Sequence, residues 1–184
     1  MIIWLKNCSC CKHIYMYFNN IPSIFGKMRK IWKNKRISLK VILSTLLYSA
    51  ELWPLTVTLS KRLDAAHHRW LRSILGVSWK DKVTNEEVRA RTGQQSILNT
   101  LSGRRLHWLG HTIRLDHHRI THQALYWEVP GFKRGPGRPR TNWRGMVKKD
   151  LRGMGLTWEE AEVAALNRQE WRRSVAQYVH VDVG

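Results

Sequence analysis

The stretch from Arg104 to Arg114 constrains the fold most, because its polar and apolar residues separate into two faces only if the chain is helical there. At about 3.6 residues per turn, three apolar side chains gather on one side: Leu106, Leu109 and Ile113. The opposite side carries cationic or protonatable groups: Arg104, His107, His111 and Arg114. Gly103 and Gly110 weaken this prediction, since each costs a helix interior roughly 1 kcal/mol. The stretch predicts a helix with one buried stripe and one basic stripe.

The charge of the whole chain points to a polyanionic partner. Lysine and arginine number 32 against 13 aspartates and glutamates, which gives a formal net charge of +19. So basic a chain repels itself in isolation, and a polyanion would relieve that repulsion. An acidic protein surface could also meet a basic stripe, but a polyphosphate backbone is the commoner partner. We therefore expect RNA or DNA backbone as the partner, and no small-molecule substrate.

Ten tryptophans outnumber the five tyrosines and three phenylalanines. Most of them stand beside Arg, Lys or His: Trp32, Trp70, Trp79, Trp108, Trp143 and Trp171. Two interpretations are open, core anchors with cations lying over them or platforms on which nucleobases stack. We favour the core interpretation.

No residue pattern in the chain is typical of an enzyme or metal site. The acidic residues are scattered, and no phosphate-binding or dinucleotide-binding glycine motif appears. Cys8, Cys10 and Cys11 are too crowded for the usual C-x2-C zinc spacing. Two histidine pairs have the i, i+4 spacing of zinc ligands: His107 with His111, and His118 with His122. Because both pairs lack the Glu of a His-Glu-x-x-His site, we expect no metal, no cofactor and no catalytic residue.

Neither apolar stretch of the N-terminal region predicts a membrane segment. Residues 1–17 are interrupted by charged and polar side chains, unlike a secretory signal. The apolar run 41–48 is much shorter than the roughly 20 residues that a bilayer span requires. We expect an intracellular protein, nuclear and/or cytoplasmic, that does not bind a membrane.

Composition divides the chain into five parts. Residues 1–25 show no period and form an irregular leader, and a helical region follows over 26–127. Residues 128–140 form a basic linker, because no helix interior tolerates their density of Pro and Gly. A C-terminal helical segment over 141–178 and a tail over 179–184 complete the chain. The expected fold is mainly α: a small helical bundle, a Pro/Gly-rich basic linker and a C-terminal helical pair.

Cap residues predict where the helices begin and end. Ser60 is a plausible N-cap for a helix that Gly76 ends. Thr84 and Glu87 have capping-box spacing, and Gly93 closes that short helix before a longer helix over about 95–115. In the C-terminal segment Thr141 can cap one helix, and Thr157 opens a second capping box.

The linker contains a Gly137-Arg138-Pro139 core with Arg134 and Arg140 on either side. This pattern resembles an AT-hook, in which an extended backbone places Arg in a narrow minor groove. A solvated hinge between two lobes is an equally good interpretation, and the two are compatible.

A short helix, a glycine turn and a longer basic helix over 84–114 also suit a helix-turn-helix that reads a major groove. Two helices joined by a turn are common in any bundle, so this interpretation stays an alternative.

Five segments, in order, resemble the C-terminal region of LINE-type (non-LTR) retrotransposon reverse transcriptases: 48–53, 70–88, 104–114, 133–143 and 150–158. The resemblance covers about residues 26–176. It implies a thumb-like helical region over 26–127 and a basic C-terminal segment, in a polyprotein whose upstream parts are an endonuclease and the polymerase. The palm aspartates of that family and its endonuclease have no counterpart in this chain. The chain alone is therefore not expected to act as an RNA-directed DNA polymerase.

Our main hypothesis is a nucleic-acid-binding C-terminal fragment of such a reverse transcriptase. The expected phosphate-binding residues lie on the predicted helix and the linker: Arg104, His107, His111, Arg114, Arg134, Arg138 and Arg140. The alternatives are a domesticated helix-turn-helix-like DNA-binding protein and a non-functional degenerate retrotransposon product.

Overall fold

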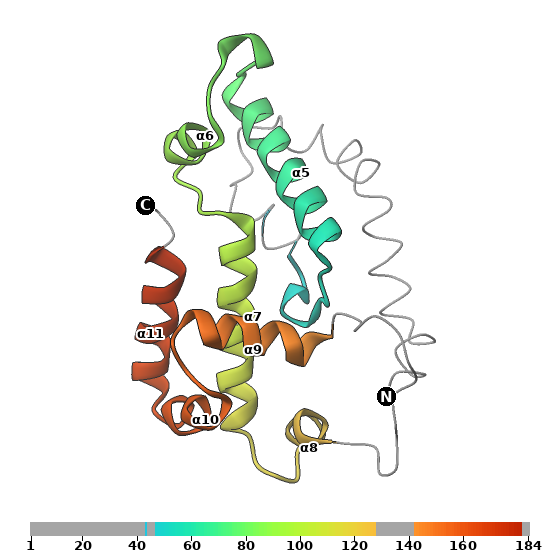
Figure 1. The fold of residues 1–184 in the computed structure, drawn as a ribbon, viewed down its shortest axis with the longest axis vertical. Helices are drawn as coiled ribbons and strands as arrows, with labels where there is room; N and C mark the ends of the chain where they lie inside the picture. The colour runs from blue at the N-terminus through green and yellow to red at the C-terminus, as the bar shows by residue number, and fades with distance from the viewer. Residues whose placement is uncertain (1–42, 44–46, 128–141, 182–184) are drawn as a thin grey trace, which may run out of the picture. The chain divides into compact units, whose positions relative to one another are not determined.

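The computed structural model describes residues 43, 47–127 and 142–181 (Figure 1). The leader over 1–25 and the linker over 128–140 lie outside the described residues. The prediction of a mainly α fold is confirmed, with seven α-helices and no strand in the described part of the chain. The elements are η1 (Ala50–Leu52), α5 (Val57–Leu75), η2 (Trp79–Asp81), α6 (Asn85–Thr92), α7 (Ile97–Ile113), α8 (Ile120–Tyr126), α9 (Trp143–Gly153), α10 (Trp158–Leu166) and α11 (Arg168–Val181).

The chain forms two compact units. Unit 1 comprises Met1–Ser49 and Thr56–Leu98, and unit 2 comprises Ala50–Leu55 and Asn99–Gly184. The division falls near the start of α7, within the region over 26–127 that the sequence predicts as one part. Among the described residues, no helix is both long and apolar enough to cross a membrane.

In unit 1, helices α5 and α6 pack around Trp70, Leu71 and Val88. The prediction that Ser60 caps α5 is wrong: the N-cap is Thr56, whose Oγ1 accepts a hydrogen bond from the Leu59 N–H at 3.3 Å. Both residues are good caps, and the helix begins at the earlier one. The other ends are confirmed, since α5 and α6 end at glycines in the left-handed conformation and Thr84 caps α6.

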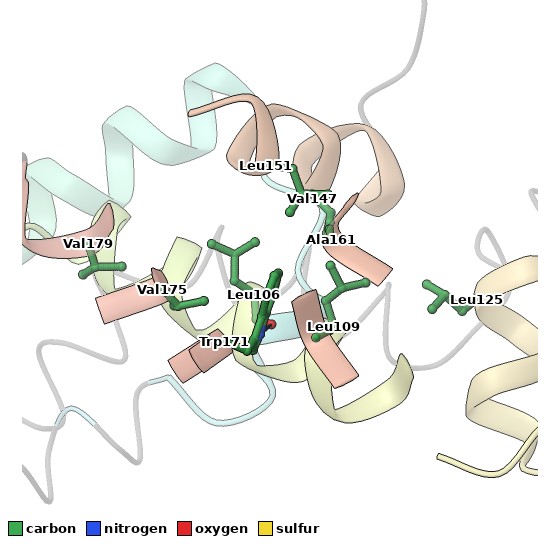
Figure 2. Packing of buried hydrophobic residues seen from close by; sticks show 10 residues of the cluster. Leu106, Leu109, Leu125, Val147, Leu151, Ala161, Trp171, Val175 and Val179 are labelled. Carbon is green, nitrogen blue, oxygen red and sulfur yellow. Dashed lines mark hydrogen bonds between the residues drawn. The ribbon is translucent and has the colours of Figure 1, made fainter. Parts of the chain in front are cut away.

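In unit 2, α7, α9, α10 and α11 share one apolar core that contains Leu106, Leu109, Val147 and Trp171 (Figure 2). The indole of Trp171 lies beside Leu106, and its N–H donates to the Leu106 carbonyl at 3.0 Å. The core interpretation of the tryptophans is confirmed for Trp70 and Trp171, which are buried. It also holds for Trp108 and Trp143, whose rings pack edge to face. Trp79 is an exception, and Trp32 lies outside the described residues.

The two glycines of α7 face the last helix. A Cβ added at Gly110 would lie 2.6 Å from Cδ1 of Trp171, and one added at Gly103 would lie 3.1 Å from Cγ2 of Val179. The two helices therefore run antiparallel past each other, with the indole seated where α7 has no side chain. The glycines weaken the helix locally but make room for its partner.

A buried ion pair joins α7 to α9. Arg105 Nε donates to Asp150 Oδ2 at 2.8 Å, and both side chains are almost fully buried. Ser102 completes the network, because its hydroxyl donates to Asp150 Oδ1 at 3.0 Å and accepts from Arg105 Nη2 at 2.9 Å. The sequence did not reveal this pairing, since Arg105 stands in a run of basic residues and Asp150 is isolated in the chain.

The C-terminal helices begin at polar caps. Asn142 caps α9 by accepting from the Gly145 N–H at 2.7 Å, whereas Thr141, the predicted cap, lies outside the described residues. The capping box of Thr157 and Glu160 is confirmed. Asn167 separates α10 from α11: its backbone is extended, and its side-chain oxygen accepts from the N–H groups of Gln169 and Glu170. Helix α11 continues to Val181, beyond the predicted end at 178.

Replacing Gly110 with alanine should destabilise the protein despite the better helix propensity of alanine. The gain in propensity is about 1 kcal/mol, whereas forcing a methyl group into a filled core costs roughly 1–3 kcal/mol. Because the Trp171 indole is fixed by its hydrogen bond, we expect a cost in the upper part of this range and a net loss of up to about 2 kcal/mol in urea unfolding. Gly103→Ala is the control, since its neighbour is a single methyl group that can shift. Equal effects of the two substitutions would contradict this account of the packing.

Unit 1 should lose stability in mild acid because of His67. Burial, together with His68 and Arg89, lowers the pKa of His67 from 6.5 to about 4. The unfolded chain therefore binds a proton that the folded chain excludes, so stability is full above pH 6.5 and falls as the pH drops towards 4. The difference corresponds to roughly 3 kcal/mol. His67→Leu should reduce the fall in melting temperature between pH 7 and 5, whereas His118→Gln, at an exposed histidine, should leave it unchanged.

Candidate nucleic-acid interface

The basic stripe predicted on α7 is present, but its members differ in exposure. Leu106 and Leu109 are fully buried on one side, while His107 and His111 are exposed on the other. Arg104 is half-buried and takes part in an interaction with the rest of the chain. The two histidines are therefore the most accessible members of the stripe.

Arg114, the last residue of the basic stripe, also makes a hydrogen bond to α10. Its Nη1 donates to the Ala165 carbonyl at 2.6 Å, in the last turn of α10. The last carbonyls of a helix have no partner within it, so the guanidinium satisfies one of them. An arginine carries five N–H donors, and this bond engages one of its nitrogens. Arg114 is thus held in place with donor capacity left for a further acceptor.

Two arginines of α11 extend the stripe beyond α7. Burial and the charge of Arg168 lower the pKa of Arg114. Partial burial of the His107 ring and the charges of Arg172 and Arg114 lower the pKa of His107. Each of these four groups, from two helices, therefore lies close enough to at least one other for their charges to interact, and we call them the basic cluster: His107, Arg114, Arg168 and Arg172.

Arg168 and Arg172 are not among the site residues that the sequence predicts. Their spacing of four residues places them on one side of α11, next to the position of Trp171. This spacing indicates that the two arginines share one side of α11. No local pattern in the sequence indicates that this side lies next to α7.

The nearby carboxylates of unit 2 have other partners. Glu162 accepts from the Tyr126 hydroxyl at 2.9 Å and from the Trp158 indole N–H at 2.7 Å. Glu160 closes the Thr157 capping box, and Asp150 is paired with Arg105. Within the described ranges, neither Arg168 nor Arg172 has a carboxylate oxygen within 4.0 Å. Among the described residues, neither arginine of the basic cluster on α11 therefore takes part in an ion pair, although Glu170 lies between them in the chain.

The remaining predicted residues, Arg134, Arg138 and Arg140, lie outside the described residues. The other histidine pair is divided, since His118 is exposed whereas His122 is buried and packs edge-on against His117. The described residues contain no group of three His, Cys, Asp or Glu side chains that could hold a metal ion.

Binding of a polyanion at the basic cluster should strengthen as the pH falls. Partial burial, together with the charges of Arg172 and Arg114, holds the pKa of His107 below its usual value in the free protein, and a bound phosphate would raise it. Binding then takes up a proton, so affinity increases towards and below about pH 6.5. Fluorescence anisotropy at constant salt, between about pH 7.5 and 5.5, would measure this increase.

His107→Gln should reduce the gain in affinity at low pH, and His118→Gln serves as the control because that exposed histidine lies outside the basic cluster. A gain that is unchanged in His107→Gln would contradict the assignment.

Comparison with known proteins finds sequence similarity to a transposon-derived protein. The chain is 24% identical, over 87% of its own length, to an uncharacterized transposon-derived protein of Caenorhabditis elegans. It spans 66% of the length of that relative. No family model matches the chain, and no solved structure matches it. The similarity supports a transposon origin for the chain.

Proposed function

We propose that the chain is a nucleic-acid-binding fragment from the C-terminal region of a LINE-type (non-LTR) retrotransposon reverse transcriptase. In this proposal it acts inside the cell on RNA or DNA and does not polymerise DNA by itself. The ordered sequence segments that resemble this family support the proposal, as does the similarity to a transposon-derived protein. The basic cluster is the structural observation that carries it.

The basic cluster suits phosphate for an electrostatic reason. Burial first, and the charges of neighbouring arginines second, lower the pKa values of His107 and Arg114, and neither Arg168 nor Arg172 forms an ion pair within the described chain. A phosphodiester backbone would bring regularly spaced negative charges to groups that already lie together, and release its counterions. Contacts of this kind position a nucleic acid without reading its sequence. We therefore expect binding that tolerates any sequence and weakens with salt.

The geometry of α7 favours this function over a helix-turn-helix. A recognition helix presents its N-terminal residues to the edges of bases. In unit 2 that half of α7 is occupied by packing: Ser102 and Arg105 bind Asp150, and Gly103 faces Val179. The exposed basic groups lie in the C-terminal half, beside α11, which suits contact with a backbone.

The salt dependence of binding tests the proposed function. Engagement of about six phosphates gives a slope of log affinity against log salt near −5. Arg168→Ala/Arg172→Ala should weaken binding to duplex DNA, single-stranded RNA and an RNA/DNA hybrid, and should make the slope shallower by about 2. Anisotropy titrations with each probe across a salt series measure both quantities.

Lys148→Ala/Lys149→Ala is the control with a matched change in charge, because these exposed lysines lie on α9 and outside the basic cluster. It should change the slope less than the α11 double variant does. A flat salt dependence of the wild type would contradict nucleic-acid binding, and equal slopes for the two variants would contradict its placement at the basic cluster. Cooperative thermal unfolding of the wild type would argue against a degenerate product.

A further inference from the structure

Trp79 differs from the tryptophans of the two packed cores because its side chain is exposed. It opens the turn η2 between α5 and α6, and 83% of its surface is exposed. Its indole takes part in none of the aromatic or cation–π contacts of the described residues. A large aromatic side chain left in water gains none of the free energy that places most tryptophans in cores. The folding of unit 1 therefore does not account for this ring.

Hydrogen bonds nevertheless anchor the turn that carries Trp79, which joins α5 to α6 in Figure 1. Arg72 of α5 donates from Nη2 to the Val83 carbonyl at 2.8 Å and to Asn85 Oδ1 at 2.9 Å. Within the turn, the Ser78 N–H donates to Asp81 Oδ2 at 2.6 Å. These bonds fix the backbone on both sides of the indole without using the indole itself.

Two exposed lysines follow Trp79 in the same turn, Lys80 and Lys82. The carboxylate of Asp81, which stands between them in the chain, accepts the Ser78 N–H. Lys82 has a φ of 48°, in the left-handed region that glycine adopts without strain. Strained residues of this kind cluster at functional sites. The turn thus carries an exposed aromatic ring followed by two exposed cations.

We propose that Trp79 stacks on an unpaired nucleobase, and that Lys80 and Lys82 contact the adjacent phosphates. The inference rests on the proposed function and adds to it, because it gives unit 1 a site for single-stranded nucleic acid. An indole offers its face equally to every base, so the site does not select sequence. Bases inside a duplex are already stacked and are unavailable to it.

Binding of the full chain to a labelled single strand of about 12 deoxythymidines tests the proposal. Trp79→Ala should weaken binding roughly 5- to 100-fold, whereas Trp79→Phe, which keeps an aromatic ring, should retain most of the affinity. Affinity for a duplex should be nearly the same in all three proteins. Circular dichroism should confirm that each variant is folded.

Two controls separate stacking from a general loss of aromatic surface. Trp127→Ala removes another exposed tryptophan, in unit 2, and should leave single-strand affinity unchanged. A strand with abasic sites keeps the phosphates but lacks bases. It should bind the wild type more weakly than the intact strand, and should bind Trp79→Ala as the intact strand does.

Single-strand affinity that is unchanged in a folded Trp79→Ala would overturn the proposal, as would equal losses in Trp79→Ala and Trp127→Ala. A change in self-association of Trp79→Ala, with unchanged affinity, would assign the ring to contact between copies and would also overturn it. These failures differ from failure of the proposed function, in which the wild type binds none of the nucleic acids. If Trp79 has no effect but Arg168→Ala/Arg172→Ala still weakens binding, only the stacking proposal fails.

Discussion

The seating of Trp171 on Gly110 is the contact on which the candidate interface in unit 2 depends. The indole occupies the space that a side chain on α7 would fill, and its N–H is tied to the Leu106 carbonyl. Arg172 follows this anchor directly, and Arg168 precedes it by less than one turn. The position of both arginines beside α7 is therefore set by an apolar contact rather than by their own charges, which repel His107 and Arg114.

The basic residues of α7 show how burial assigns different tasks to similar side chains. Arg105 is buried against Asp150, which pairs with its charge, and its Nε and Nη2 donate to Asp150 and Ser102. Its neighbour on the chain, Arg104, is half-buried, and Arg114 supports the end of α10. Arg168 and Arg172 of α11 are exposed and form no ion pair in the described chain. A count of basic residues alone would not distinguish these tasks.

Short sequence patterns predict helix ends correctly where a few neighbouring residues determine them. Gly76 and Gly93 end their helices because a left-handed residue is needed there, and Thr157 opens a capping box that depends on four consecutive residues. The prediction of Ser60 as the cap of α5 fails because a second suitable cap, Thr56, stands four residues earlier, and only the packed helix decides between them. The partner of Arg105, the contribution of Arg172 and the exposure of Trp79 depend on residues far apart in the chain. Sequence periodicity gives no access to such contacts, and the roles predicted for Arg134, Arg138 and Arg140 stay predictions.

The break at Asn167 shows how small a change could rearrange the candidate interface. Helices α10 and α11 are separated by this residue alone, which ends the first helix and caps the second. Its extended backbone ends α10, and the Ala165 carbonyl accepts a hydrogen bond from Arg114. A strong helix former at this position would favour one long rod through both segments. Such a rod would separate Arg168 and Arg172 from α7 without altering a single charge, so the arrangement of cations is encoded as much in a helix break as in the basic residues themselves.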